Sequence, residues 1–299
     1  MSVISTNINA MFAQNTLTSN GRAQSTSMQQ LSTGSRVNSA RDDAAGLAIG
    51  QNMTSQIRGL NQSVKNANDG ISMLQTADGA LATQSDMLQR MNELAVQSAT
   101  GTNSDTQRGY LNTEFQALAV QIDKISTDTL WNGKAILTGT GGDVVSTGAG
   151  KDTFTLQTGL GSGNTTTVKI SAMGKANLGL VESDTMGTAG TPASTGTVKS
   201  VTIDIQANAR AAIKIVGDAI GMVNTQRANI GAVSNQLTYA ADNMTNISSN
   251  VNASRSQIMD TDYAQATTQL AKTQIIAQAA TAMLAQANQQ PQSVLALLK

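Results

Sequence analysis

The chain has 299 residues, of which only 2% are aromatic and 13% charged, against about 25% charged in an ordinary domain, so Ala, Leu, Ile, Val and Met must fill a thin helical core. Its 19 basic and 19 acidic residues cancel, which leaves no net field to attract nucleic acid or an anionic membrane. The sequence has no Cys and no His, which excludes disulfides and thiolate metal sites and removes the commonest general base and metal ligand, so we expect a protein that is not an enzyme and binds no cofactor.

The first 35 residues carry one charged side chain, Arg22. Apolar residues nevertheless recur there at helical spacing, at Ile4, Ile8, Met11 and Phe12. The start has neither a basic segment nor a long apolar run, so we expect no cleaved secretory signal. No run of about 18 apolar residues occurs, so no membrane-spanning helix is predicted.

A long helix is predicted over residues 44–98, which contain no Pro. Its apolar residues alternate at spacings of three and four, the pattern of a coiled-coil seam, and a helix of this length would extend ~80 Å. For its start, Ser39 and Asp42 fit a capping box, and Asp43 is the alternative cap. The seam consists of Leu60, Ala67, Leu74, Leu81, Leu88 and Ala95, with Ile57, Val64 and Ile71 beside it.

A shorter helix is expected after the Gly101–Asp105 interruption, folding back on the first. Its apolar positions are Leu111, Phe115, Leu118, Ile122 and Ile125. Heptads then vanish, and residues 131–134 contain the Asn-Gly pair of a type I′ hairpin. A second hairpin is predicted from residues 154–158 and 165–170, while residues 138–151 and 183–197 are predicted as loops.

A second seam follows in the C-terminal part of the chain and is expected to pack on the first. Its heptad row is Val216, Val223, Ile230, Leu237, Met244, Val251 and Ile258, with Val233, Ala240 and Ile247 beside it. After Asp262 the only charges are Lys272 and Lys299. A narrow apolar stripe continues through Tyr263, Leu270, Ala277 and Leu284.

Both chain ends are therefore amphipathic but too polar and too narrowly apolar to offset the entropy of folding alone. We infer that they are disordered in the monomer and become helical when other copies surround them. The alternative is that they are flexible tails, but tails seldom keep helical periodicity.

The sequence offers no convincing site for chemistry. Residues 148–152 lack the Ser or Thr and the upstream Gly of a phosphate-binding loop. Asp42 and Asp43 stand at a helix start, where capping is their ordinary role. Four Met residues at helical spacing favour seam packing over a copper site: Met87, Met91, Met244 and Met283.

Several long stretches closely resemble bacterial flagellins and follow one another in the order of that family. They are residues 2–10, 31–49, 68–80, 88–98 and 282–299. The resemblance implies a subunit that polymerises into the flagellar filament for motility, located outside the cell. It also implies passage through the flagellar type III export channel.

The expected fold is mainly α, an elongated, long antiparallel coiled-coil-like helical bundle with a small β-hairpin region. By the resemblance, the two terminal helices pair as an inner coiled coil and the seams form an outer core domain. The expected parts are an N-terminal inner helix at 1–38, the first core part at 39–180, a short variable loop at 181–200, the C-terminal long core helix at 201–258 and a C-terminal inner helix at 259–299.

The resemblance also implies partners and contact residues. The partners are further copies of the chain, an export chaperone on residues 263–284, the filament cap and hook-junction proteins, and host Toll-like receptor 5, with no nucleic acid and no membrane. The family's receptor and inter-subunit contact falls on Arg90, Leu94 and Glu114, with Leu94 expected as an exposed apolar anchor. Without the resemblance, Arg90 and Glu114 would be interpreted as a solvated ion pair.

Residues at both ends are expected to drive polymerisation: Ile4, Ile8, Phe12, Leu270, Ala277 and Leu284. Two rival functions come from other classes. One is the related hook-filament junction protein, which would not form long filaments alone. The other is a hydrolase that uses carboxylates in the central region, which a scan against generic substrates would detect.

Overall fold

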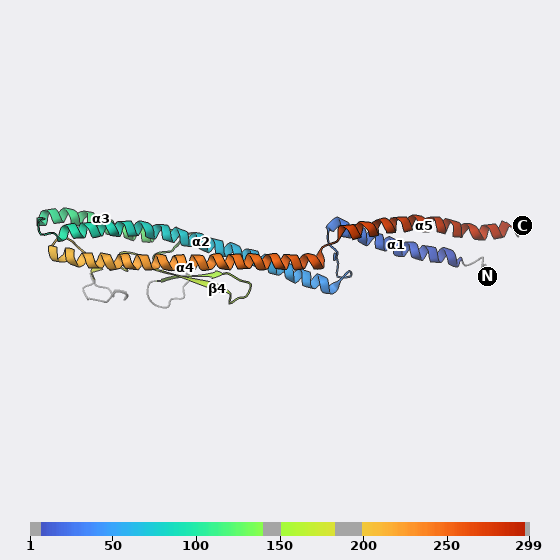
Figure 1. Cartoon of the computed structure of the whole chain (residues 1–299), viewed down its shortest axis with the longest axis horizontal. Coiled ribbons are helices and arrows are strands. Elements are labelled where there is room, and N and C mark those ends of the chain that lie inside the picture. The colour runs from blue at the N-terminus through green and yellow to red at the C-terminus, as the bar shows by residue number, and fades with distance from the viewer. Residues whose placement is uncertain (1–6, 140–150, 183–198, 297–299) are drawn as a thin grey trace. The chain divides into compact units, whose positions relative to one another are not determined.

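The computed structural model of the chain describes residues 7–139, 151–182 and 199–296. Within these ranges the fold is mainly α with three antiparallel pairs of short strands, which confirms the predicted fold class (Figure 1). The helices are α1 Ile8–Thr33, α2 Ala44–Ala99, α3 Asp105–Asp128, α4 Gln206–Met259 and α5 Tyr263–Ala296.

The chain divides into two compact units. The terminal unit comprises Met1–Arg58 and Ser248–Lys299, and the central unit comprises Gly59–Ile247. The terminal unit contains α1 and α5, and the central unit contains α3 and the strands. Helices α2 and α4 contribute residues to both units.

The core of the central unit is the predicted double seam. The heptad row of α2 is buried throughout, at Leu60, Ala67, Leu74, Leu81, Leu88 and Ala95. The matching row of α4 is buried at Val216, Val223, Ile230, Leu237 and Met244. Most of these residues join Phe115 and Ile122 of α3 in one apolar cluster, so the sequence correctly predicted that the seams pack together.

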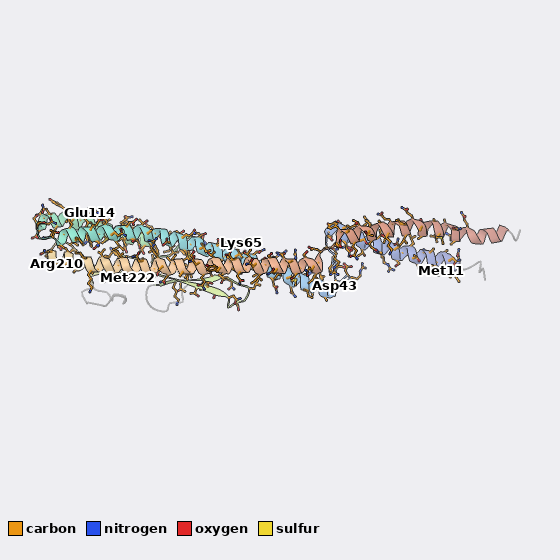
Figure 2. All side chains as sticks on the ribbon, in the orientation of Figure 1. Met11, Asp43, Lys65, Glu114, Arg210 and Met222 are labelled. Atoms are coloured by element: carbon orange, nitrogen blue, oxygen red, sulfur yellow. The ribbon has the colours of Figure 1, made fainter. Side chains whose placement is uncertain are left out.

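Polar side chains tie α2 and α4 in antiparallel order. The Arg227 guanidinium on α4 donates to the Asp78 carboxylate on α2 at 2.8 Å. Near the end of the same pair, the Gln206 amide donates to the Ala99 carbonyl at 2.9 Å. Rising residue numbers on α4 therefore meet falling numbers on α2, as Figure 2 shows for the paired helices.

One predicted seam residue faces solvent instead of the core. Ile247 is 40% exposed, whereas Ala241, Met244 and Ser248 are buried. An ideal helix drifts ~20° per heptad from an exact seven-residue repeat, so after several heptads the buried stripe has moved one residue along the chain. The prediction for Ile247 was wrong for this reason.

The long C-terminal core helix begins later than residue 201. Val201 and Ile203 are buried in a segment that precedes α4 and is neither helix nor strand. The Val201 amide donates to the Leu180 carbonyl at 3.2 Å, and the Ile203 amide donates to the Asn112 side chain at 3.0 Å. Because these bonds hold the segment against α3, the helix starts only at Gln206.

Both predicted hairpins are present. Strands β1 (Leu130–Trp131) and β2 (Lys134–Ala135) are joined by Asn132 and Gly133, whose φ values of 49° and 77° are those of a type I′ turn. Strands β3 (Lys151–Gln157) and β4 (Thr165–Ser171) pair over their full length.

A third strand pair was not predicted. Strands β5 (Val181–Glu182) and β6 (Lys199–Ser200) form an antiparallel pair at the two ends of the expected variable loop. The rest of that loop, and most of the predicted loop 138–151, lie outside the described residues.

Specific caps fix the ends of the helices in the first half of the chain. Asp43 is the cap of α2, because its carboxylate accepts from the Gly46 amide at 2.8 Å. Asp42 instead accepts from the Ser39 amide and hydroxyl, both at 2.9 Å, and these bonds hold the pKa of Asp42 below its usual value. Ser104 and Gln107 form a full capping box at the start of α3.

Candidate assembly interface

Backbone hydrogen bonds join the two terminal helices of the chain where α1 ends and α5 begins. The Arg36 amide donates to the Met259 carbonyl at 2.6 Å, and the Thr261 amide donates to the Gly34 carbonyl at 2.9 Å. Gly34 ends α1 with a φ of 69°, a left-handed conformation that glycine adopts without strain. This short pairing sets α1 and α5 side by side in the terminal unit.

Two asparagines tie α1 to α5 farther along. The Asn20 amide donates to the Thr273 carbonyl at 2.7 Å in a buried position, and the Asn7 amide donates to the Ala287 carbonyl at 2.7 Å. The side-chain oxygen Oδ1 of Asn7 also accepts from the Ala10 amide at 3.0 Å and so caps α1. The two helices therefore run antiparallel.

The interior between α1 and α5 fully buries only small and polar side chains, while the leucines that face it, such as Leu17 and Leu284, are half-buried. Its buried residues are Asn20, Ser27, Ala266 and Thr273. Three predicted polymerisation residues, Leu270, Ala277 and Leu284, are half-buried on α5. A seam of this composition buries little large apolar area, so it stabilises the pair far less than the central core is stabilised.

Several of the largest apolar side chains of the terminal helices are exposed. Phe12 is 75% exposed, and Ile8 beside it is also exposed. These two predicted polymerisation residues do not pack on α5, while the third at this end, Ile4, lies outside the described residues. Other exposed apolar residues are Met11, Met28, Tyr263, Ile275 and Met283.

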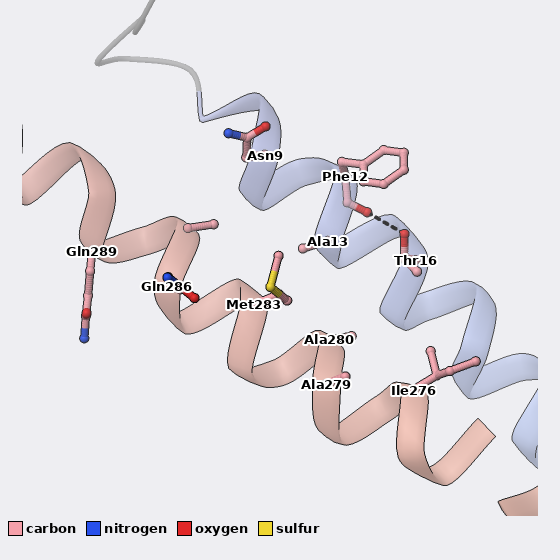
Figure 3. Close-up of a pocket in the computed structure, with 11 residues that line it drawn as sticks. Asn9, Phe12, Ala13, Thr16, Ile276, Ala279, Ala280, Met283, Gln286 and Gln289 are labelled. Carbon is pink, nitrogen blue, oxygen red and sulfur yellow. Dashed lines mark hydrogen bonds between the residues drawn. The ribbon is translucent and has the colours of Figure 1, made fainter. Parts of the chain in front are cut away.

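A groove of about 890 Å³ runs between the outer parts of α1 and α5. Phe12 and Ala13 line it from α1, and Ile276, Ala280 and Met283 line it from α5. Figure 3 shows Ala13, Ala280 and Met283 directed into the space between the helices. Polar Asn9, Thr16, Gln286 and Gln289 also line the groove. Within the helices themselves the only charged residues are Arg22 and Lys272, so the groove is mostly apolar and its lining carries no charge.

Arg90 and Glu114, the two predicted contact residues that carry charge, lie together in the central unit. The Arg90 guanidinium donates to Glu114 on α3 at 3.0 Å and to Glu93 on its own helix at 2.9 Å. These two carboxylates raise the pKa of Arg90, Glu114 contributing most. All three side chains are largely exposed, so the cluster is a solvated charged patch that joins α2 to α3.

Leu94 does not belong to that exposed patch, and its predicted role as an exposed anchor was wrong. Its side chain is 1% exposed and lies in the core cluster with Met91 and Phe115. Spacing of four residues places Leu94 and Arg90 near one another on a helix, but α2 here is covered by both α3 and α4. Its buried arc is therefore wide enough to include Leu94.

Two exposed apolar residues near the Arg90 patch are Val96 on α2 and Tyr110 on α3. Tyr110 lies four residues before Glu114 on α3, and Val96 lies three residues after Glu93 on α2, so each shares a helix face with one of the carboxylates. The sequence analysis missed both residues. Their signal was an apolar residue outside the heptad row of its helix.

Metal ions require sets of several ligands, which the described residues would have to supply. No group of three or more Asp and Glu side chains in that part of the chain could hold a metal ion. Among the described helices, none is long and apolar enough to cross a membrane.

Comparison with known proteins identifies the family of the chain. Residues 4–141 match the bacterial flagellin N-terminal helical region, and residues 213–298 match the bacterial flagellin C-terminal helical region. A flagellin of Bacillus subtilis is 41% identical over 99% of both chains. This chain belongs to the bacterial flagellin family.

A second flagellar relative of this flagellin chain is the flagellar filament 33 kDa core protein of Treponema phagedenis. It is 38% identical and covers 99% of this chain and all of its own. Among solved structures, a flagellar hook-associated protein of Vibrio parahaemolyticus has a TM-score of 0.57 over 73% of this chain and 100% of its own, at 17% identity. That similarity concerns the fold alone.

Proposed function

We propose that this flagellin chain is the structural subunit of a flagellar filament and that neighbouring copies bury the outer surfaces of α1 and α5. One observation carries the proposal: the largest side chains of the terminal helices, among them Phe12 and Met283, are exposed on helices that hold one charged residue each. The name of the Treponema relative, a filament core protein, supports it.

The composition of the terminal unit explains why assembly and folding of the ends would be coupled. The side chains that are fully buried between α1 and α5 are small or polar, so the gain from burial within one chain stays close to the entropy cost of ordering the helices. Covering Ile8, Phe12 and Met283 with other copies adds about 1.5–3 kcal/mol for each large side chain that becomes fully buried. The ends would therefore become stably helical only in the polymer.

Truncation tests this mechanism directly. We expect chains that lack residues 1–35, or those after Asp262, to keep a folded central unit but to form no filaments when mixed with filament seeds. Electron microscopy and sedimentation measure the polymer, and circular dichroism measures the remaining helix. Filaments of normal length from either truncated chain would show that the ends are not needed for assembly.

A point substitution separates the apolar surface from the mere presence of the ends. Phe12→Ser should raise the protein concentration needed for elongation by at least about tenfold, because one large buried contact per subunit is lost. Gln14→Ser, at an exposed polar position on the same helix, is the matched control and should elongate like the unsubstituted chain.

Export follows from the same properties. A chain without Cys and with marginally stable ends can pass unfolded through the narrow type III channel. We propose that the export chaperone covers the α5 stripe from Tyr263 to Leu284 before assembly, and that the filament cap and hook-junction proteins meet the assembled ends. The hook-filament junction alternative is favoured by no observation here, and elongation from seeds by the purified chain would distinguish a filament subunit from it.

We further propose that Toll-like receptor 5 would contact the charged patch of Arg90 and Glu114 on released monomers, with Leu94 supporting α2 from inside. Glu114→Ala should then weaken receptor signalling by the monomer without lowering its melting temperature. Arg227→Ala, which breaks another exposed ion pair of the central unit, is the control and should leave signalling unchanged. Equal signalling by the Glu114 variant would remove the receptor from the proposal.

A further inference from the structure

Three hydrogen bonds define how α1 and α5 are aligned. Asn7 bonds to the carbonyl of Ala287 and Asn20 to that of Thr273, both at 2.7 Å. Near the root of the pair, the Tyr263 hydroxyl donates to the Leu31 carbonyl at 3.4 Å. From one bond to the next, each step forward along α1 is matched by a step of nearly the same number of residues backward along α5. A single antiparallel register therefore holds from one end of the pair to the other.

These bonds alone cannot select that register. Every residue of a helix presents a backbone carbonyl, and the residues one heptad from Thr273, Ala266 and Ala280, have side chains at least as small. The Asn20 amide could therefore bond to either neighbouring position after a slip of seven residues. The asparagines determine which faces of the helices meet. Another feature must determine which heptad of α5 lies opposite a given heptad of α1.

Side-chain size supplies that feature. On α1, small Ala10 is followed one heptad later by large Leu17, and on α5 small Ala277 is followed by large Leu284. In the observed register Ala10 lies level with Leu284, and Leu17 lies level with Ala277. A slip of one heptad would set Leu17 against Leu284, or against Leu270 in the other direction. Two large side chains in one layer overpack the seam, and two small ones leave a gap.

We propose that these two layers, Ala10 with Leu284 and Leu17 with Ala277, select the register in which the terminal helices pair. The register matters because it sets the shape of the groove. A slip of seven residues would shift Phe12 past Met283 by about 10 Å, and neighbouring copies would meet a different surface. The effect on neighbouring copies rests on the proposed function, whereas the register itself is a property of a single chain.

A size swap tests the layer of Leu17 and Ala277. Leu17→Ala leaves a gap in the layer and Ala277→Leu overfills it, so each single substitution should slow filament elongation at least about tenfold. The double substitution restores one large and one small residue and should recover elongation to within about threefold of the unsubstituted chain. Failure of the double substitution to recover beyond either single one would overturn the pairing.

Cross-linking measures the register itself, since the chain has no Cys of its own. Ala13→Cys combined with Ala280→Cys reports the observed register, and Ala13→Cys combined with Ala287→Cys reports a slip of one heptad. A disulfide needs Cα atoms within about 7 Å, so each pair can close in only one of the two registers. Oxidised filaments should give at least about ten times more intrachain product with the first pair.

Two further measurements accompany the cross-linking. One detects products formed between subunits, and the other measures the register without filaments. Mixing chains that each carry one of the two cysteines reveals any product formed between subunits, which is subtracted. The same pairs are oxidised in soluble chain with trimethylamine N-oxide, which favours the folded ends. If the unsubstituted chain forms no filaments, the proposed function fails, while the soluble arm still decides the register. Similar yields from the two pairs where the ends are helical would refute the proposal.

Discussion

Leu81 tests the packing of the central unit most directly. Its side chain is 0% exposed, and Leu74 and Leu88, one heptad away on either side, are buried in the same cluster. Leu81→Ala removes the largest part of a fully enclosed side chain and leaves a cavity that a long, straight seam can close only in part. The expected loss is about 2–5 kcal/mol of unfolding free energy.

That loss converts into a measurable shift in melting temperature. For a domain of roughly 150–250 residues, each kcal/mol lowers the melting temperature by about 2–4 °C, so Leu81→Ala should melt about 4–20 °C earlier. Thermal unfolding of the soluble full-length chain followed by circular dichroism gives the temperature. Urea titration gives the free energy and shows whether the slope is unchanged, as two-state comparison requires.

Leu130→Ala is the matched control. It makes the same chemical change at a position in β1 that is 53% exposed, and it should change stability by no more than about 0.5 kcal/mol. Leu81→Asp should be more harmful than Leu81→Ala, because it also buries a charge. If Leu81→Ala and Leu130→Ala melted at the same temperature, the burial of the α2 seam would be refuted.

Three further predictions concern the helix ends and glycines. Gly79→Ala should raise stability by about 0.5–1 kcal/mol, since a Cβ there meets nothing within 4 Å. Gly50→Ala should raise it less, since the Cβ would lie 2.5 Å from the Met259 sulfur and that side chain would have to shift. Paired melting curves check the difference. Arg108→Leu should cost about 1.5–3 kcal/mol in urea titration, because the buried guanidinium donates to two carbonyls at the end of α2, at 3.2 and 3.0 Å. Hydrogen bonds from Thr202 and Asn208 lower the pKa of Asp204. The ionised carboxylate therefore stabilises the fold above about pH 4, and this stabilisation is lost as the pH falls through the lower pKa of the folded state. Asp204→Asn should be less stable than the unsubstituted chain at neutral pH, and the two stabilities should converge in acid.

The long helices were predictable because their signal is local. A row of apolar residues every seven positions marks the buried face whether or not the partner is known. The residues of that row from Leu74 to Ala95 are buried as expected. The Asn132-Gly133 turn was predictable for a similar reason, since its positive φ values depend on those two residues. Features that depend on a residue far away in the sequence could not be predicted from such local patterns.

Leu94 and Ile203 show what local patterns miss. Leu94 is buried because α3 and α4 both cover α2 at that level, and no spacing within α2 reveals how many helices cover it. Ile203 lies outside the helix because its amide bonds to Asn112 on α3, so the start of α4 is set by a partner about ninety residues earlier. In both cases tertiary contacts override the local pattern.

The two units of the chain distribute the same residue types in opposite ways, and this difference has a measurable consequence. In the central unit the large side chains face inward, so its stability should not depend on protein concentration. In the paired helices α1 and α5 the largest side chains, such as Phe12 and Met283, are exposed and the fully buried ones are small or polar, so the stability of this pair should rise as copies meet. A substitution such as Leu81→Ala should therefore shift the melting of monomer and polymer alike. Phe12→Ser should leave the monomer unchanged and act only through the concentration at which filaments form.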